Sequence, residues 1–211
     1  MARNNSLFYK VCKRTFDIVF SSCVLVVLCI PGVLLAAAIS IESPGGPMFR
    51  QKRVGKGGKE INIWKFRSMY ADAHEHPERY LNEAQMAQWN REQKVDNDPR
   101  VTKIGSFIRR TSLDETPQFI NVLKGDISVI GPRPVTLAET YEFGEARSNV
   151  LSVRPGITGW WQVKARNKAT WENGQRQALE LEYVNGCSFA MDAAVFVGTF
   201  GAMFGKDRSG R

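Results

Sequence analysis

An uncharged apolar run near the start of the chain constrains its fold more than any other feature. The 24 residues from Ile18 to Ile41 contain no charged side chain. A straight helix of that length would reach roughly 36 Å at about 1.5 Å per residue, which is enough to cross a hydrocarbon core of about 30 Å. The segment therefore predicts a membrane protein.

The flanks of this run, and a proline inside it, favour a re-entrant helical hairpin. Basic residues lie on both sides, namely Arg3, Lys10, Lys13 and Arg14 before it and Arg50, Lys52, Arg53, Lys56 and Lys59 after it. Cytoplasmic flanks are the basic ones, so both ends are expected on the cytoplasmic side. Pro31 lacks a backbone donor and clashes with the preceding turn, so we expect the helix to bend there and return to its leaflet. A kinked single span is the alternative that stays open.

The segments around the hairpin predict a division into two domains. Residues 1–42 are expected to form the membrane anchor, in which Leu7 to Phe20 is an interfacial helix with its apolar residues along one face. Residues 43–211 are expected to form a cytosolic catalytic domain, long enough for one hydrophobic core. The apolar stretch Phe189 to Phe204 has 16 residues, which is short for a span, so we expect it to pack on the membrane surface or against the hairpin.

The catalytic domain is predicted to be mixed α/β and helix-rich, with short strands and interfacial helices. Met48–Arg53 and Ile61–Phe66 read as two strands around the turn Gly55–Gly58. That turn is not a phosphate loop, because no Ser or Thr follows its lysine. Residues 71–94 are polar and rich in helix formers, and the histidines there lack a third metal ligand, so we expect them at the surface.

Charge and cysteine content narrow the class of protein. The net charge of +8 suits a protein that lies against anionic lipid and handles a phosphorylated substrate. Nucleic-acid binding would explain that charge equally well. The four cysteines, Cys12, Cys23, Cys29 and Cys187, show no Cys-x-x-Cys spacing. Neither a disulfide framework nor a zinc site is predicted.

The chemistry is expected between Asp98 and Pro134. Ser112-Leu-Asp-Glu115 has the form of a helix-capping box, although Pro117 would then lie one turn into the helix. The other interpretation is that Asp114 and Glu115 are a carboxylate pair that handles phosphate. Basic residues lie on both sides of the pair, at Arg109-Arg110 and, after the expected strand Ile127–Ile130, in Gly131-Pro-Arg-Pro134. The residues alone leave both interpretations open.

A series of motifs in chain order carries a family resemblance. They are Lys13-Arg14-x-x-Asp17, Phe49-Arg-Gln-x-Arg-Val-Gly55, Lys65-Phe-Arg-Ser-Met69, Asp98-Pro-Arg-Val-Thr-x-x-Gly105, Arg110-Thr-Ser-Leu-Asp-Glu115, Asn121-Val-Leu-Lys-Gly-Asp126, Gly131-Pro-Arg-Pro134 and Arg154-Pro-Gly-Ile-Thr-Gly159. With the apolar hairpin they cover nearly the whole chain. The series resembles the bacterial sugar transferases, monotopic phosphoglycosyl transferases that start glycan assembly on a lipid carrier. One departure is that Ile30 precedes Pro31, where the family commonly has Ser before Pro.

The resemblance implies a reaction and a set of site residues. A sugar 1-phosphate would pass from a UDP-sugar to a polyprenol phosphate such as undecaprenyl phosphate, with Mg²⁺ as cofactor and UMP released. Asp114 would be the nucleophile that forms an aspartyl-phosphosugar, and also the metal ligand, with Glu115 assisting. The substrate-binding residues that the resemblance implies are Lys65, Arg109, Arg133, Pro134, Arg154 and Arg166.

The resemblance also implies a place and partners. The place is the cytoplasmic face of the bacterial inner membrane, in exopolysaccharide or O-antigen synthesis. Membrane lipids, downstream glycosyltransferases and a second copy of the chain are candidate partners, and no nucleic-acid partner is expected. The alternatives are a non-catalytic membrane-anchored assembly partner of glycan enzymes and a membrane-tethered nucleic-acid binder. The intact Asp114-Glu115 pair counts against both, while no motif reveals the sugar or the role of residues 70–97.

Overall fold

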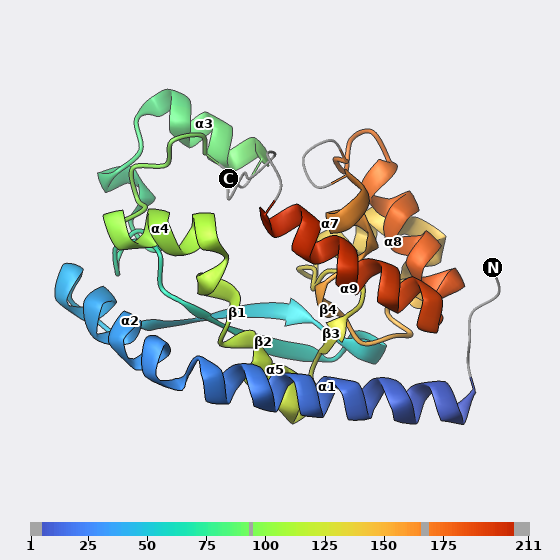
Figure 1. Ribbon diagram of the computed structural model, residues 1–211. Coiled ribbons are helices and arrows are strands. Elements are labelled where there is room, and N and C mark those ends of the chain that lie inside the picture. The colour runs from blue at the N-terminus through green and yellow to red at the C-terminus, as the bar shows by residue number, and fades with distance from the viewer. Residues whose placement is uncertain (1–5, 93–94, 166–168, 205–211) are drawn as a thin grey trace. The chain divides into compact units, whose positions relative to one another are not determined.

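The chain folds into two compact units, each drawn from several stretches of sequence. The computed structural model describes residues 6–92, 95–165 and 169–204 (Figure 1). Unit 1 contains the described residues of Met1–Val27, Arg50–Trp64 and Pro117–Arg208. Unit 2 contains Leu28–Phe49 and the described residues of Lys65–Thr116. These units are defined by packing contacts. The predicted division at residue 42 separates a membrane anchor from a catalytic domain, and it stays a prediction.

Most of the regular structure is helical, as predicted. Unit 1 holds α1 (Leu7–Val27), η1 (Lys56–Gly58), α5 (Gln118–Lys124), β3 (Ser128–Ile130), η4 (Glu139–Ala146), α6 (Arg147–Val150), β4 (Gly156–Thr158), α7 (Trp160–Ala165), α8 (Gln175–Gly186) and α9 (Phe189–Phe204). Unit 2 holds α2 (Cys29–Glu42), η2 (Pro77–Arg79), α3 (Glu83–Glu92), α4 (Lys103–Thr111) and η3 (Leu113–Glu115). The predicted hairpin is confirmed as β1 (Met48–Val54) paired with β2 (Glu60–Phe66).

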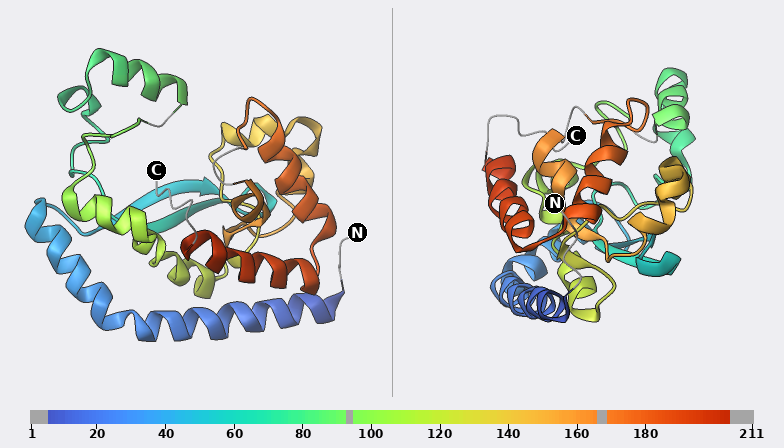
Figure 2. Two further views of the ribbon diagram at one scale, coloured as in Figure 1. Left: turned by 45° about the horizontal axis from the view of Figure 1, so that its top comes forward. Right: turned by 90° about the vertical axis from the view of Figure 1, so that its right-hand side faces the viewer.

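In unit 1, α1 buries its polar side and exposes its apolar side. Residues at a spacing of four, including Tyr9, Asp17 and Ser21, face the protein and are buried. Phe8 and Val11 on the other side are more than half exposed. The right-hand view of Figure 2 shows α1 end-on with α5 and α9 beside it, and the Phe20 ring meets Phe119 and Phe196 edge to face. The predicted amphipathic helix is confirmed, and α9 is the predicted C-terminal apolar helix.

A short parallel pair of strands organises the core of unit 1. Strand β3 pairs with β4 in the register Ser128 to Gly156 and Ile130 to Thr158. The backbones approach so closely after β3 that a Cβ atom on Gly156 would lie 2.1 Å from the Gly131 nitrogen. Side chains buried around this pair include Ile127, Val129, Ile130, Val184 and Val195. The glycines of two quoted motifs are therefore required by backbone packing.

In unit 2, the end of α2 is tied to α4 and to the segment after β2. The Glu42 carboxylate accepts a hydrogen bond from the Ile104 N–H, in the first turn of α4, at 3.1 Å. The buried guanidinium of Arg67 donates to the carbonyl oxygens of Ser43 at 2.5 Å and Pro44 at 3.0 Å. Within residues 71–92 only α3 is an α-helix, because the chain before it runs through turns around Pro77.

The membrane segment is broken, but not at the predicted residue. Helix α1 ends at Val27, α2 begins at Cys29, and the two helices are bent by 61°. Pro31 lies in the first turn of α2, and a proline ring clashes with the carbonyl four residues before it, here that of Val27. The bend therefore precedes the proline by about one turn. In the described part of the chain no single helix is long and apolar enough to cross a membrane; α1 and α2 pass that test only as a bent pair.

Candidate active site

The carboxylate pair lies in a single tight turn between two helices. Asp114 and Glu115 belong to η3, directly after α4, and α5 begins only at Gln118. Ser112 has a φ of +57° and ends α4 in the left-handed conformation, with its N–H donating to the Arg109 carbonyl oxygen at 3.2 Å. Its side chain makes no capping hydrogen bond. The capping-box interpretation is therefore wrong, because Ser112 ends α4 in the left-handed conformation and precedes η3 without a side-chain capping hydrogen bond.

The left-handed residue before the pair leads to a stability prediction. A β-branched side chain at Ser112 should cost about 1 kcal/mol of unfolding free energy relative to Ser, because the second branch on Cβ crowds a backbone of positive φ, where β-branched residues are rare. We expect Ser112→Val to lower the thermal midpoint and Ser112→Gly to leave it equal or higher. Ser106→Val, on the exposed side of α4, is the control and should cost no more than about 0.7 kcal/mol. Equal losses for the two valine variants would contradict the prediction.

Two cations from other elements of unit 2 meet the carboxylate pair. Lys65, near the end of β2, places its Nζ 3.0 Å from an Oε of Glu115. Arg109, in the last turn of α4, lies close enough to Asp114 for the two charges to interact, and its Nε donates to the Ser68 hydroxyl at 2.8 Å. The structure thus brings together Lys65, Arg109, Asp114 and Glu115, four of the residues that the resemblance singled out.

Helix α4 is locked onto the segment that carries Lys65. The Thr102 N–H donates to the Ser68 carbonyl oxygen at 3.2 Å, and the Thr102 hydroxyl accepts from the Gly105 N–H at 2.9 Å. A Cβ atom on Gly105 would lie 2.0 Å from the Ser68 carbonyl oxygen, so only glycine permits this approach. Ser68 and Thr102 were not predicted as site residues, although both lie inside the quoted motifs. Ser68 holds Arg109 through its hydroxyl, and Thr102 holds the start of α4 through its hydroxyl and its N–H.

The environment of Asp114 raises its pKa. Burial has the largest effect and the neighbouring Glu115 carboxylate adds to it, while Lys65 and Arg109 act in the opposite direction, and the pKa rises to about 6. The side chain is thus mostly ionised at neutral pH but close to its titration range. An ionised carboxylate held among cations in a partly buried turn is suited to attack or bind a phosphorylated group.

The pair also bears on the predicted magnesium ion. Among the described residues no group of three or more His, Cys, Asp or Glu side chains could hold a metal. Mg²⁺ is usually held by one or two carboxylates together with substrate phosphates and water, so Asp114 and Glu115 fit such an ion. The repulsion between these carboxylates, which raises the pKa of Asp114, is what a bound cation would relieve. Magnesium stays a prediction.

The other predicted substrate residues belong to unit 1 or lie outside the described residues. The Arg133 N–H donates to a Glu180 carboxylate oxygen at 3.0 Å, its guanidinium lies 6.0 Å from the ring centre of Trp161, and Pro134 follows it in the same loop. The Nε of Arg154 donates to the Gly125 carbonyl oxygen at 2.9 Å. Arg166 lies outside the residues that the structure describes.

Sequence reasoning missed Glu180, the carboxylate that holds the Arg133 loop. Its side chain is 1% exposed, and burial raises its pKa to about 8. Arg176, one helical turn earlier in α8, packs against the ring of Trp171 at 4.1 Å. The available signal was a charged residue at helical spacing from the buried Tyr183 and Val184.

Comparison with known proteins agrees with the motifs. A family model described as bacterial sugar transferase matches residues 8–206. The chain is 36% identical to undecaprenyl-phosphate galactose phosphotransferase of Salmonella typhimurium, over 98% of its own length and 43% of that protein. It is 36% identical to UDP-glucose:undecaprenyl-phosphate glucose-1-phosphate transferase of Escherichia coli, over 88% of its length and 39% of that protein. It is 33% identical to the exopolysaccharide production protein ExoY of Rhizobium meliloti, over 90% of its own length and 84% of that protein.

Proposed function

The chain belongs to the bacterial sugar transferase family, and we propose that it transfers a sugar 1-phosphate from a UDP-sugar to undecaprenyl phosphate. The observation that carries the proposal is the meeting of Asp114 and Glu115 with Lys65 and Arg109 in one unit. The relatives with undecaprenyl phosphate in their names support the acceptor. The chain spans less than half the length of those relatives and 84% of ExoY from Rhizobium meliloti.

The reaction takes place in two displacements at one phosphorus atom. An oxygen of the ionised Asp114 carboxylate attacks the sugar-bearing β-phosphorus, and the bond from that phosphorus to the oxygen bridging it to UMP breaks. UMP leaves with the electron pair of that bond. A phosphate oxygen of the lipid then attacks the aspartyl-phosphosugar, the bond to Asp114 breaks, and the carboxylate is regenerated. Lys65 and Arg109 supply positive charge for the phosphate oxygens, as a point charge and a planar donor respectively.

A magnesium ion at the carboxylate pair would neutralise phosphate charge when bound. Asp114 and Glu115 would hold it. The residues of the chain keep the pair in place: Ser112 ends α4 just before it, and Ser68 orients Arg109. A carboxylate is a weak nucleophile, so its attack depends on being held in the right position. The partial burial of Asp114 and its contacts with neighbouring residues provide that positioning.

The chain acts at the membrane, with α1 and α2 as a re-entrant pair that enters and leaves on the cytoplasmic side. The bend of 61° between the amphipathic α1 and the apolar α2 supports this arrangement, as do the basic residues on both flanks. In α2, Ile30, Val33 and Leu34 are each more than half exposed, which suits contact with lipid. The acceptor phosphate lies at headgroup level, so such an anchor would let a soluble donor meet a membrane-bound acceptor. Polysaccharide or exopolysaccharide synthesis is the corresponding pathway class.

The pKa of Asp114 predicts the acid limb of the pH profile. Only the ionised carboxylate attacks, so kcat/KM for UMP release should show an acid limb set by the pKa of Asp114, which is raised to about 6 without a bound cation and is lowered when Mg²⁺ is bound. Glu115→Gln removes a charge that raises the pKa of Asp114, so the limb should move to lower pH. Lys65→Met removes a charge that lowers this pKa, so the limb should move to higher pH. If the acid limb lies at the same pH in both variants as in the native protein, it does not report the ionisation of Asp114.

The proposed activity is tested by UMP release from a panel of UDP-sugars. The full chain in detergent or nanodiscs is mixed with Mg²⁺ and undecaprenyl phosphate, and the same mixtures are repeated with EDTA and without the lipid. Release from at least one donor that depends on both the lipid and the cation is the expected result. No release from any donor would overturn the transferase proposal and favour a non-catalytic role in glycan assembly.

A further inference from the structure

Unit 1 contains a basic cavity that includes none of the four residues Lys65, Arg109, Asp114 and Glu115. It has a volume of about 150 Å³ and lies between the buried side of α1, the turn η1 and the loop that leads into β4. The basic residues that line it are Lys10, Lys13, Arg14, Lys56 and Arg154. Neither carboxylate of the pair in η3 lines it. Arg154 is the residue that it shares with the predicted substrate-binding set.

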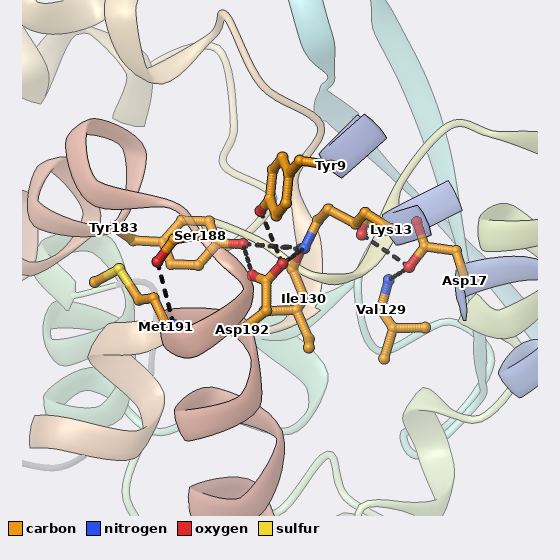
Figure 3. A network of polar contacts seen from close by, with 10 residues as sticks. Tyr9, Lys13, Asp17, Val129, Ile130, Tyr183, Ser188, Met191 and Asp192 are labelled. Atoms are coloured by element: carbon orange, nitrogen blue, oxygen red, sulfur yellow. Dashed lines mark hydrogen bonds and ion pairs between the residues drawn. The ribbon is translucent and has the colours of Figure 1, made fainter. Parts of the chain in front are cut away.

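Part of this charge is already compensated inside the protein. Lys13 lies 2.7 Å from a carboxylate oxygen of Asp192, and the hydroxyls of Tyr9 and Tyr183 donate to the same carboxylate (Figure 3). The acidic residue among the lining side chains is Asp17, whose carboxylate accepts hydrogen bonds from the Ser128 hydroxyl and the Val129 N–H, both at 2.9 Å. These contacts stabilise the cavity wall.

Among the described residues that line the cavity, the remaining cations outnumber the acids. Five basic side chains line the cavity. Asp192 neutralises Lys13 and Asp17 supplies one more negative charge, so three positive charges remain among the described lining residues. Arg14 is held by the carbonyl oxygens of Val122 and Leu123, which neutralise no charge. Lys10, Lys56 and Arg154 are exposed. Like charges gathered around one cavity repel each other, so an anion bound there would be stabilised by several of them at once.

The chemistry of the lining identifies the kind of anion. Ammonium and guanidinium groups arranged around a small space are typical of phosphate recognition. The same helix exposes Leu7, Phe8 and Val11 next to Lys10. Basic side chains beside an exposed apolar helix face lie at the level of lipid headgroups, where they contact lipid phosphates. A soluble phosphate would make no use of that neighbouring apolar face.

We propose that this cavity binds the headgroup phosphate of an anionic membrane lipid through the exposed side chains of Lys10, Lys56 and Arg154, with the charge of Arg14 in its wall adding to the attraction. The bound lipid would anchor α1 of unit 1 at the membrane surface independently of the carboxylate pair. The proposal concerns lipid binding and does not require the transferase activity, so either can fail without the other.

The test measures lipid binding to the purified full chain by native mass spectrometry. The probes are dihexanoyl phosphatidylglycerol, dihexanoyl phosphatidylcholine, inorganic phosphate and a short-chain polyprenyl phosphate. Native protein is compared with Lys10→Gln/Lys56→Gln and with the control Lys52→Gln/Lys59→Gln, which removes two exposed charges from the same unit outside the cavity. Thermal unfolding confirms that each variant is folded, which is expected because all four side chains are exposed.

Native protein and the control should bind phosphatidylglycerol alike and more tightly than phosphatidylcholine. Lys10→Gln/Lys56→Gln should bind it roughly 30-fold more weakly, as expected for the loss of two cations near a lipid phosphate. Equal affinity in the cavity variant, or an equal loss in the control, would overturn the site. Inorganic phosphate binding as tightly as the lipid would overturn the lipid assignment, and so would a preference for the polyprenyl phosphate.

Discussion

Replacement of Asp114 by Asn is expected to lower UMP release by at least about 1,000-fold, as is typical when a covalent nucleophile is removed. Asn keeps the shape of the side chain but has no anionic oxygen to attack phosphorus. The turn η3 should survive the change, because it is held by backbone contacts such as the Glu115 N–H to the Ser112 carbonyl oxygen at 3.3 Å. The measurement is UMP release with saturating donor and acceptor.

The matched control for this variant is Asp96→Asn, an exposed aspartate of the same unit. It should retain activity within about twofold, in line with the small effects of most surface substitutions. Trapping distinguishes the nucleophile from a mere binding group: native protein incubated with labelled UDP-sugar without acceptor should carry label on the Asp114 peptide. Activity retained in Asp114→Asn, or label on another residue, would remove Asp114 from the proposed role.

Replacement of Arg67 by Met is expected to lower the unfolding free energy by about 3 kcal/mol, as when one partner of a buried charged hydrogen-bond network is lost. The Arg67 side chain is 8% exposed and supplies donors to the carbonyl oxygens of Ser43, Pro44 and Gly45. Met fills a similar volume without donors, so these carbonyl oxygens would lose their partner. The thermal midpoint reports the loss.

The control for Arg67 is Arg79→Met, which removes an ion pair to Asp72 at 2.8 Å from a side chain that is 59% exposed. An exposed ion pair contributes only about 0–1 kcal/mol, so this variant should unfold close to the native temperature. The Arg67 variant should also lose UMP release, because Arg67 lies next to Ser68, which orients Arg109. A midpoint no lower than that of the control would show that the carbonyl oxygens find other partners.

Much of the fold could be predicted from local sequence. The β1–β2 hairpin follows from two β-rich segments around a glycine turn, the start of α1 follows from apolar periodicity, and α9 coincides with the apolar stretch Phe189 to Phe204. The bend was predicted from Pro31 but lies at Leu28, because a proline disturbs the turn that precedes it. Residues 71–94 are rich in helix formers, but within their described part only α3 is an α-helix, since polar composition is compatible with turns as well as helix.

The candidate site was predictable in its residues and not in its geometry. The order of motifs singled out Asp114, Glu115, Lys65 and Arg109, which the structure brings together in unit 2. Spacing alone suggested a capping box at Ser112, because an S-x-x-E pattern is the same whether a helix starts or has just ended there. Only the left-handed φ of Ser112 decides between the two.

The sequence by itself determined the features whose causes lie within a few residues: the apolar helices, the presence of a break in the membrane segment, the hairpin turn and the identity of the carboxylate pair. The tertiary structure alone decided the contacts that join distant residues. Glu42 accepts from Ile104, Glu180 holds the Arg133 loop, and Lys13 pairs with Asp192. A local sequence pattern predicts which face of an element is buried, but not which distant residues that face contacts. The basic cavity and the raised pKa of Asp114 depend on such contacts, so they could be described only from the tertiary structure.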